Sequence, residues 1–179
     1  MNPIRILWVN PSFLDYRIPF YKSLHEFCNG NFYLAYSKSR VPERCINKIT
    51  NSLGENALCL EKEKHISFNN AKSDFSCASI SIPYPSGLSR LLSSVNADII
   101  IGEGFFQWTP WALKYSLSKK IPLLLAYERT AHTERNCPSW RTMYRRLINK
   151  FVSGYLVNGS LCRQYLQEQI RTQDKMIIE

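Results

Sequence analysis

The sequence predicts an α/β fold: a Rossmann-like, doubly wound and mostly parallel sheet with helices on both faces. The first observation is a set of short apolar runs, at residues 4–9, 32–36, 99–101, 123–126 and 155–157. Runs that are apolar throughout are typical of parallel strands that are covered on both faces. The second observation is that helical patterns separate these runs, and such alternation favours an open α/β sheet.

Five segments carry apolar residues at helical spacing, and each predicts a helix with one buried face. The expected faces are Phe20, Leu24, Phe27 and Cys28; Leu88, Leu91, Leu92 and Val95; Leu113 and Leu117; Trp140, Met143, Tyr144, Leu147, Ile148 and Phe151; and Leu161, Tyr165 and Leu166. Ser86, Thr109 and Ser160 are the expected N-caps, and Pro110 suits a first helical turn.

Two stretches of the chain have weaker patterns. Residues 40–74 hold many Asn, Lys, Ser and Glu, and we expect one short helix, a strand near 57–60 and a mobile loop. The final residues, 174–179, resemble the beginning of a strand. Residues 1–172 are therefore predicted to form one Rossmann-like domain, and 173–179 the start of a linker or of a missing donor-binding domain.

Composition limits the class of protein. The 179 residues are 45% hydrophobic and 13% aromatic, enough for a substantial core, so a disordered chain is not expected. Lys and Arg outnumber Asp and Glu by 23 to 14, which gives a net charge of +9. That excess suits anionic partners such as phosphate groups, acidic lipid surfaces or nucleic acid, although net charge alone favours a solvated basic surface.

Several site types lack their sequence signature. The six cysteines form no Cys-x-x-Cys pair, so a zinc site is not expected, and we interpret them as reduced thiols of a cytoplasmic protein. The N-terminus does not resemble a signal peptide, and no apolar run approaches the roughly 20 residues that span a bilayer. There is no P-loop, no Gly-x-Ser-x-Gly turn and no Asp-x-Asp motif, so we predict no bound metal.

The loop after the first strand supplies Ser12, Asp15 and Arg17 near a helix start. A hydroxyl, a carboxylate and a guanidinium at such a position suit recognition of a polyol or a phosphate. Alternatively, Asp15 caps the helix and Arg17 pairs with it.

Two further loops follow strands and carry polar groups. The loop after residue 101 contains Glu103 between two glycines, then three aromatic residues that could stack on a sugar or pack in the core. Its second glycine is Gly104, and Gln107 replaces the last glycine of a dinucleotide-binding motif.

The densest polar cluster comes after residue 126. Its members are Glu128, Arg129, His132, Glu134 and Arg135. His132 could exchange a proton near neutral pH, and a surface salt-bridge cluster is the structural alternative.

Because parallel strands end at one edge of a sheet, these loops are predicted to converge on one cleft. Residues Ser12, Arg17, Glu103, Gly104, Glu128 and His132 would line this cleft.

The order and spacing of four segments resemble the N-terminal half of GT-B glycosyltransferases of family 4. The segments are Asp15-Tyr-Arg-Ile-Pro-Phe-Tyr-Lys-Ser-Leu, Ala97-Asp-Ile-Ile-Ile-Gly-Glu-Gly, Lys120-Ile-Pro-Leu-Leu-Leu-Ala-Tyr-Glu running to His132, and Tyr155-Leu-Val-Asn-Gly-Ser-Leu-Cys-Arg-Gln-Tyr-Leu followed by Asp174-Lys-Met-Ile-Ile. The chain lacks the paired glycines that many members have in the first loop, and the glycine before the final Lys-Ile pair.

The resemblance implies a metal-independent enzyme whose N-terminal half binds the acceptor and whose C-terminal half binds a nucleotide-sugar. It places His132 at the reacting sugar as the catalytic residue. The acceptor would contact Ser12, Asp15, Arg17, Glu103, Gly104, Glu128 and Arg129. No cofactor is expected in this domain, and this chain alone would be an inactive hexosyltransferase half.

The predicted function is therefore acceptor binding for glycan synthesis, of a polysaccharide or a glycolipid. The expected partners are a sugar or lipid-linked sugar acceptor, the C-terminal donor-binding domain and an anionic inner membrane face contacted peripherally. The alternative is a stand-alone α/β module that binds a sugar or nucleotide without transferring it. Nucleic acid is not an expected partner, because Arg141, Arg145, Arg146 and Lys150 do not share one helical face.

Overall fold

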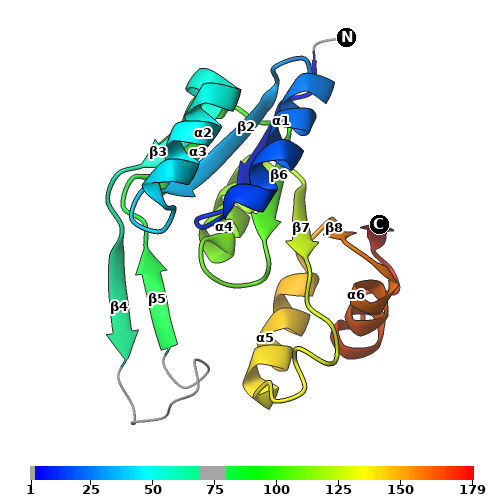
Figure 1. The fold of residues 1–179 in the computed structure, drawn as a ribbon. Coiled ribbons are helices and arrows are strands. Elements are labelled where there is room, and N and C mark those ends of the chain that lie inside the picture. The colour runs from blue at the N-terminus through cyan, green and yellow to red at the C-terminus, as the bar shows by residue number, and fades with distance from the viewer. Residues whose placement is uncertain (1–2, 69–79) are drawn as a thin grey trace.

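The computed structural model describes residues 3–68 and 80–179 and confirms the predicted doubly wound α/β fold (Figure 1). The described residues form a seven-stranded parallel sheet in the order β3-β2-β1-β6-β7-β8-β9. The strands are β3 (Ala57–Leu60), β2 (Phe32–Ser37), β1 (Ile6–Val9), β6 (Ile99–Glu103), β7 (Leu123–Tyr127), β8 (Gly154–Val157) and β9 (Met176–Ile178). The strand order reverses between β1 and β6, so the carboxyl ends of these two strands mark the switch point where ligands bind in such sheets.

Helices cover both faces of this sheet. On one face α1 (Ile18–Phe27) and α2 (Glu43–Leu53) bury Tyr21 and Ile49 against Trp8 and Leu34. On the other face pack α3 (Leu88–Val95), α4 (Thr109–Lys119), α5 (Ser139–Asn149) and α6 (Ser160–Tyr165), which a π-helical turn (Leu166–Ile170) extends. Neighbouring residues of β1 point to opposite faces, as the two-residue period of a strand requires.

An antiparallel hairpin leaves the sheet after β3. It consists of β4 (Lys64–Phe68) and β5 (Ile80–Tyr84), and it extends past the carboxyl ends of the parallel strands (Figure 1). The sequence predicted the helix α2 and the strand β3 in this part of the chain, but a loop where β4 lies; residues 69–74 of that loop are outside the described part. The loop prediction was wrong for β4, because strand pairing with β5 compensates for its weak local pattern.

The base of the hairpin is fixed by a buried carboxylate just before β4. Glu63 accepts hydrogen bonds from Arg40 (2.9 Å), Trp108 Nε1 (2.8 Å) and Ser37 Oγ (2.9 Å), and its side chain is 0% exposed. A buried charge with several donors is stabilised where an isolated one would not be. These bonds connect the hairpin to β2 and to the start of α4.

The predicted helices are present, but their starts differ from the expected caps. Gly87 precedes α3 with a φ of 99°, a left-handed conformation that favours glycine over Ser86. Trp108 and Gly159 precede α4 and α6, so Thr109 and Ser160 lie inside these helices. The Thr109 hydroxyl donates instead to the carbonyl of Gly104 at 2.9 Å.

Four of the predicted apolar faces are only partly buried. In α1 the buried residues are Ile18 and Tyr21, whereas Phe20 and Phe27 are exposed. In α5 the residue Ile148 is buried, but Trp140, Met143 and Leu147 are exposed to solvent, as is Phe151 just after the helix. Leu117 of α4 and Leu161 of α6 are exposed as well. Helical periodicity identified these helices correctly, but it did not identify which side the sheet covers.

The last strand is an edge of the sheet. β9 pairs in parallel with β8, with Met176 opposite Gly154 and Ile178 opposite Leu156. The strand expected from residues 174–179 is therefore present. The boundary at residue 172 between this domain and a following one remains a prediction.

Candidate functional site

Three charged side chains meet at the switch point of the sheet. Glu103 is the last residue of β6, Glu128 follows β7 directly, and Arg17 ends a short 3-10 helix (Asp15–Arg17) before α1. Arg17 Nη2 donates a hydrogen bond to Glu103 Oε1 (3.0 Å) and another to Glu128. Trp8 Nε1, from β1, donates to Glu103 Oε2 at 3.0 Å. We call Arg17, Glu103 and Glu128 the acidic wall, since two carboxylates share one guanidinium.

Burial dominates the electrostatics of Glu103. Desolvation raises the pKa of its carboxyl, and the charge of Arg17 and the hydrogen bond from Trp8 oppose this rise only in part. The nearby charge of Glu128 acts in the same direction as burial, because it repels a second negative charge. A carboxyl whose pKa is raised exchanges a proton more readily near neutral pH, as a group in a binding or catalytic site often does.

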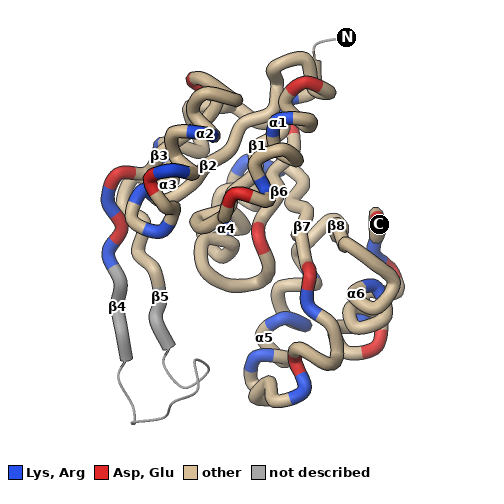
Figure 2. The backbone as a smooth tube through the Cα atoms, viewed as in Figure 1, with Lys and Arg blue, Asp and Glu red and all other residues tan. Residues whose placement is uncertain are grey.

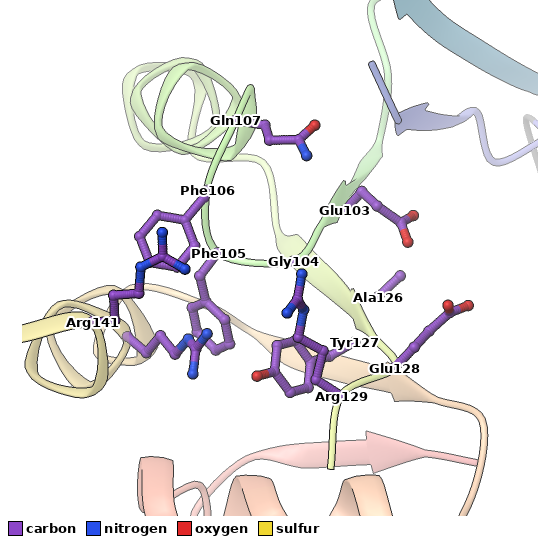
Figure 3. A pocket seen from close by; sticks show the side chains of 11 residues that line it. Glu103, Gly104, Phe105, Phe106, Gln107, Ala126, Tyr127, Glu128, Arg129 and Arg141 are labelled. Atoms are coloured by element: carbon purple, nitrogen blue, oxygen red, sulfur yellow. The ribbon is translucent and has the colours of Figure 1, made fainter. Parts of the chain in front are cut away.

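A hollow of about 250 Å³ opens beside the acidic wall (Figure 3). Its lining comes from the ends of β6 and β7 and from α5: Glu103, Gly104, Phe105, Phe106, Gln107, Ala126, Tyr127, Glu128, Arg129, Arg141 and Arg145. Glu103 and Glu128 lie on one side of it, and Phe106 and Arg141 on the other (Figure 3). Gly104 lies between these two sides and has a φ of 64°, a left-handed conformation that other residues rarely adopt. Because glycine has no side chain, the backbone of Gly104 is open to the hollow.

Three arginines make the rest of the lining of the hollow positive. Arg145 donates to Glu134 Oε2 (2.7 Å) and to the Tyr165 hydroxyl (2.7 Å), and Arg129 donates to Glu134 Oε1 (3.0 Å). Arg141 lies over the rings of Phe106 (5.3 Å) and Trp140 (5.4 Å). We call Arg129, Arg141 and Arg145 the basic wall; three cations there face one carboxylate, that of Glu134.

Glu134 responds to this environment in the opposite way to Glu103. Burial raises its pKa, but the hydrogen bond and the charge of Arg145 and the charge of Arg129 outweigh burial and hold the pKa below its usual range. Glu134 is therefore ionised near neutral pH, which leaves an excess of two positive charges on the basic wall.

A second hollow, of about 330 Å³, lies next to the first and has a more apolar lining. Tyr16, Phe20 and Leu156 contribute to it, and it shares Ala126, Tyr127 and Glu128 with the first hollow. Arg17 also lines it, so the acidic wall separates two concave surfaces at one edge of the sheet.

The structure brings together five of the predicted site residues. Arg17, Glu103, Gly104, Glu128 and Arg129 line one or both of the hollows, as expected from loops at the carboxyl edge.

Three other predicted residues lie elsewhere. Ser12 is exposed and its hydroxyl donates to the Arg40 carbonyl at 3.5 Å; it lines neither hollow. Asp15 pairs with Arg44 (2.9 Å) and Lys48 (2.8 Å) of α2. It does not pair with Arg17, because residues two apart in a 3-10 helix point in different directions. His132 is exposed on the turns after β7, where Arg135 donates to its Nε2 at 3.1 Å, and it lines neither hollow.

The sequence reasoning missed the contribution of α5. Arg141 and Arg145 line the first hollow, and Phe106 stacks on Tyr144 with ring centroids 5.0 Å apart. The four basic residues of this helix do not share one face, but Arg141 and Arg145 are four apart and therefore do. That spacing was the available signal for the basic wall.

Two properties concern the described residues as a whole. Among residues 3–68 and 80–179, no group of three or more His, Cys, Asp or Glu side chains is arranged to hold a metal ion. None of the helices in this described part combines the length and apolar character that crossing a bilayer requires.

Comparison with known proteins finds no family model that matches the chain, and no match among curated proteins. Fold and site therefore define the class: a Rossmann-like α/β domain with a ligand-sized, charge-separated hollow at the switch point of its sheet.

Proposed function

We propose that this chain is the acceptor-binding, N-terminal domain of a GT-B glycosyltransferase that uses a nucleotide-sugar donor for glycan or glycolipid synthesis. The observation that carries the proposal is the convergence of Arg17, Glu103 and Glu128 beside a hollow at the switch point. This is the place where open α/β sheets bind their ligands.

The chemistry of the hollow suits a sugar. Carboxylates accept hydrogen bonds from hydroxyl groups, and Arg17 keeps Glu103 and Glu128 oriented for this task. Phe106 and Tyr127 also line the hollow, which gives it an apolar part beside the carboxylates. A volume of about 250 Å³ lies just below the roughly 300–1,000 Å³ of pockets for drug-sized ligands, so it suits a single sugar unit.

Within this proposal, Glu128 orients the acceptor hydroxyl and accepts its proton. Its side chain is 40% exposed and lines both hollows, whereas Glu103 is more deeply buried. His132, the residue that the family resemblance favours, lies on the exposed turn beyond Glu128. The donor diphosphate would be held by a second domain, since no Gly-rich phosphate loop occurs in this sequence.

Titration of the chain with neutral methyl glycosides, followed by amide NMR shifts, tests acceptor binding. We expect shifts at Gly104 and Ala126, and at least a tenfold weaker affinity in Glu128→Gln, since a charged acceptor contributes about 1.5–3 kcal/mol. Glu55→Gln is the matched control, because Glu55 is exposed and lines neither hollow. Amide shifts confined to residues outside the two hollows would contradict the proposal.

Calorimetry against uridine, guanosine and adenosine diphosphate sugars tests whether the donor is bound by a second domain and not by this chain. We expect weak or absent binding and no release of nucleoside diphosphate above background, because closure of a second domain is needed to align donor and acceptor. Micromolar affinity for any of these donors would instead assign the donor, not the acceptor, to this chain.

We also propose that α5 contacts an anionic membrane face. Trp140, Met143 and Leu147 lie on one side of the helix, Met143 is 69% exposed, and the exposed Phe151 follows just after the helix. Arg146 and Lys150 flank this side, and basic residues recur along α5 (Figure 2). A helix with exposed apolar residues flanked by cations suits the interface of an acidic leaflet.

Cosedimentation with vesicles tests this contact. Binding to anionic vesicles at low salt should fade as salt rises, and should be weaker in Met143→Gln than in the control Met176→Gln, whose residue is exposed on β9. Equal binding to neutral and anionic vesicles, or none at low salt, would contradict the proposal.

A further inference from the structure

Two groups of side chains with opposite net charge border the first hollow. The acidic wall has two carboxylates and one guanidinium, and the basic wall has three guanidiniums and the single carboxylate of Glu134. A neutral sugar would use the acidic wall but would leave the positive excess of the basic wall without a counter-charge. The hollow therefore suits a ligand that carries hydroxyls at one end and negative charge at the other.

Arg141 is the cation that is available to such a ligand. It forms no ion pair with any residue in the described part of the chain. The rings of Phe106 and Trp140 hold its guanidinium at 5.3 and 5.4 Å, which fixes its position without neutralising its charge. A guanidinium that is oriented in this way has less conformational freedom to lose when it binds an anion.

Arg145 and Glu134 form the support of the basic wall. Their side chains are 3% and 4% exposed, and Arg145 also donates to Tyr165. Arg129 shares Glu134 with Arg145 but is 63% exposed, so it can turn toward a ligand at little cost. Arg129 and Arg141 thus offer N–H donors to a ligand, while the buried Arg145 contributes positive electrostatic potential.

We propose that Arg129 and Arg141 bind a phosphate group, so that the acceptor of this domain is a phosphorylated sugar whose ring lies against Glu103 and Glu128. The sugar part of this inference rests on the proposed function, and the phosphate site follows from the basic wall alone. Guanidinium groups match the oxygens of phosphate and form two parallel hydrogen bonds to them. The phosphate can be that of a free sugar phosphate or of a phospholipid headgroup, since both present the same oxygens.

Calorimetric titrations of the whole chain with inorganic phosphate, hexose 1-phosphate, methyl hexoside and glucuronate test the inference. Hexose 1-phosphate should bind at least tenfold more tightly than methyl hexoside, because each charge-assisted bond adds about 1.5–3 kcal/mol. This gain should shrink as salt is raised. Vesicles containing phosphatidylinositol distinguish a headgroup from a free sugar phosphate, since only a headgroup acceptor would compete with hexose 1-phosphate from the vesicle.

Substitutions locate the phosphate. Arg141→Gln and Arg129→Gln should each remove most of the gain in affinity that hexose 1-phosphate has over methyl hexoside, because each variant loses a charged donor to the phosphate. Arg90→Gln removes the same charge from α3, away from both hollows, and should change neither affinity. Thermal unfolding of each variant verifies that it folds.

The outcomes separate this inference from the proposed function. Equal affinities for hexose 1-phosphate and methyl hexoside, or glucuronate binding as tight as hexose 1-phosphate, would overturn the phosphate assignment and leave acceptor binding intact. Binding of inorganic phosphate that is lost in Arg141→Gln, together with no binding of methyl hexoside, would support the phosphate site and contradict the sugar-binding function.

Discussion

The two walls of the hollow use the same residue types in opposite ratios, and their central carboxylates behave in opposite ways. Glu103 competes with Glu128 for one arginine, and burial raises its pKa. Glu134 is bonded by two arginines, which hold its pKa below the usual range although burial opposes them.

Desolvation penalises both carboxylates, so the number of cations within contact decides the direction of the pKa shift. The centre of the basic wall is consequently a buried, neutralised Arg145–Glu134 pair, and the positive excess of this wall belongs to Arg129 and Arg141. The acidic wall keeps a carboxylate that burial and crowding make less stable, as is common where a ligand completes the site.

The largest effect is expected from Glu134→Ala. It leaves the buried Arg145 without its counter-charge, which should lower the free energy of unfolding by about 3–5 kcal/mol. Because the pKa of Glu134 is lowered in the folded state, its contribution is present above the ordinary glutamate pKa and disappears as pH falls through the lowered value. The difference in free energy of unfolding between wild type and variant, measured by urea unfolding, should therefore become smaller below about pH 4.

Glu61→Ala is the control for this substitution, because Glu61 pairs with Lys38 on the exposed surface. This control should lower the free energy of unfolding by less than about 1 kcal/mol. If Glu134→Ala lowers the free energy of unfolding by as little as the control does, the buried pair contributes little to stability.

Arg17→Met should have the next largest effect, and its loss of stability should also grow as pH rises, although over a higher pH range than that of Glu134→Ala. It removes the cation that Glu103 and Glu128 share, at an expected cost of about 1–3 kcal/mol near neutral pH. Without Arg17 the pKa of Glu103 should rise further, and a raised folded-state pKa means that stability falls as pH increases through that range.

The deficit of Arg17→Met should therefore be larger at about pH 8 than at about pH 5, as measured by urea unfolding at both values. A deficit that does not change with pH would indicate that Arg17 acts through packing and not through the two carboxylates.

Glu103→Gln should change stability by no more than about 1.5 kcal/mol near neutral pH, because the amide oxygen can still accept the bond from Trp8 or Arg17. Relative to wild type, this variant should become more stable as pH rises, since it lacks the carboxyl whose ionisation burial disfavours. Thermal unfolding of wild type and variant at a series of pH values measures this trend. A trend of the opposite sign would contradict a raised pKa of Glu103.

The smallest effect is expected from Arg129→Gln. Arg129 is 63% exposed, and Glu134 retains Arg145, so the loss should stay below about 1 kcal/mol by chemical unfolding. Arg135→Gln, on the same turns, is the matched control. A loss near that of Glu134→Ala would mean that both arginines are needed to keep Glu134 ionised.

Much of the fold could be predicted from the sequence because it depends on local patterns. The parallel strands are short apolar runs, and each run appears as a strand within a residue or two of its predicted position. The hairpin β4-β5 could not be predicted in this way, because the apolar content of residues 64–68 is low and their pairing partner lies beyond residue 79. Its base depends on Glu63, which finds Arg40 and Trp108 only in the folded chain.

The acidic wall could also be predicted, since Glu103 ends a strand, Arg17 and Glu128 lie in segments that follow strands, and parallel strands end at one edge. Ser12, Asp15 and His132 occupy the same loops but lie outside both hollows. The direction of a side chain on a loop depends on neighbours such as Arg44 and Lys48, which pair with Asp15 from another helix.

The sequence by itself determined the α/β class, the strands of the parallel sheet and the edge at which the polar loops meet, because these follow from apolar periodicity and from chain connectivity. Only the tertiary structure decided that α5 would turn Arg141 and Arg145 toward that edge while Met143 and Leu147 face solvent. The periodicity of a helix defines its faces, but the position of the helix against the sheet decides which face is buried. The charge separation of the hollow depends on that choice.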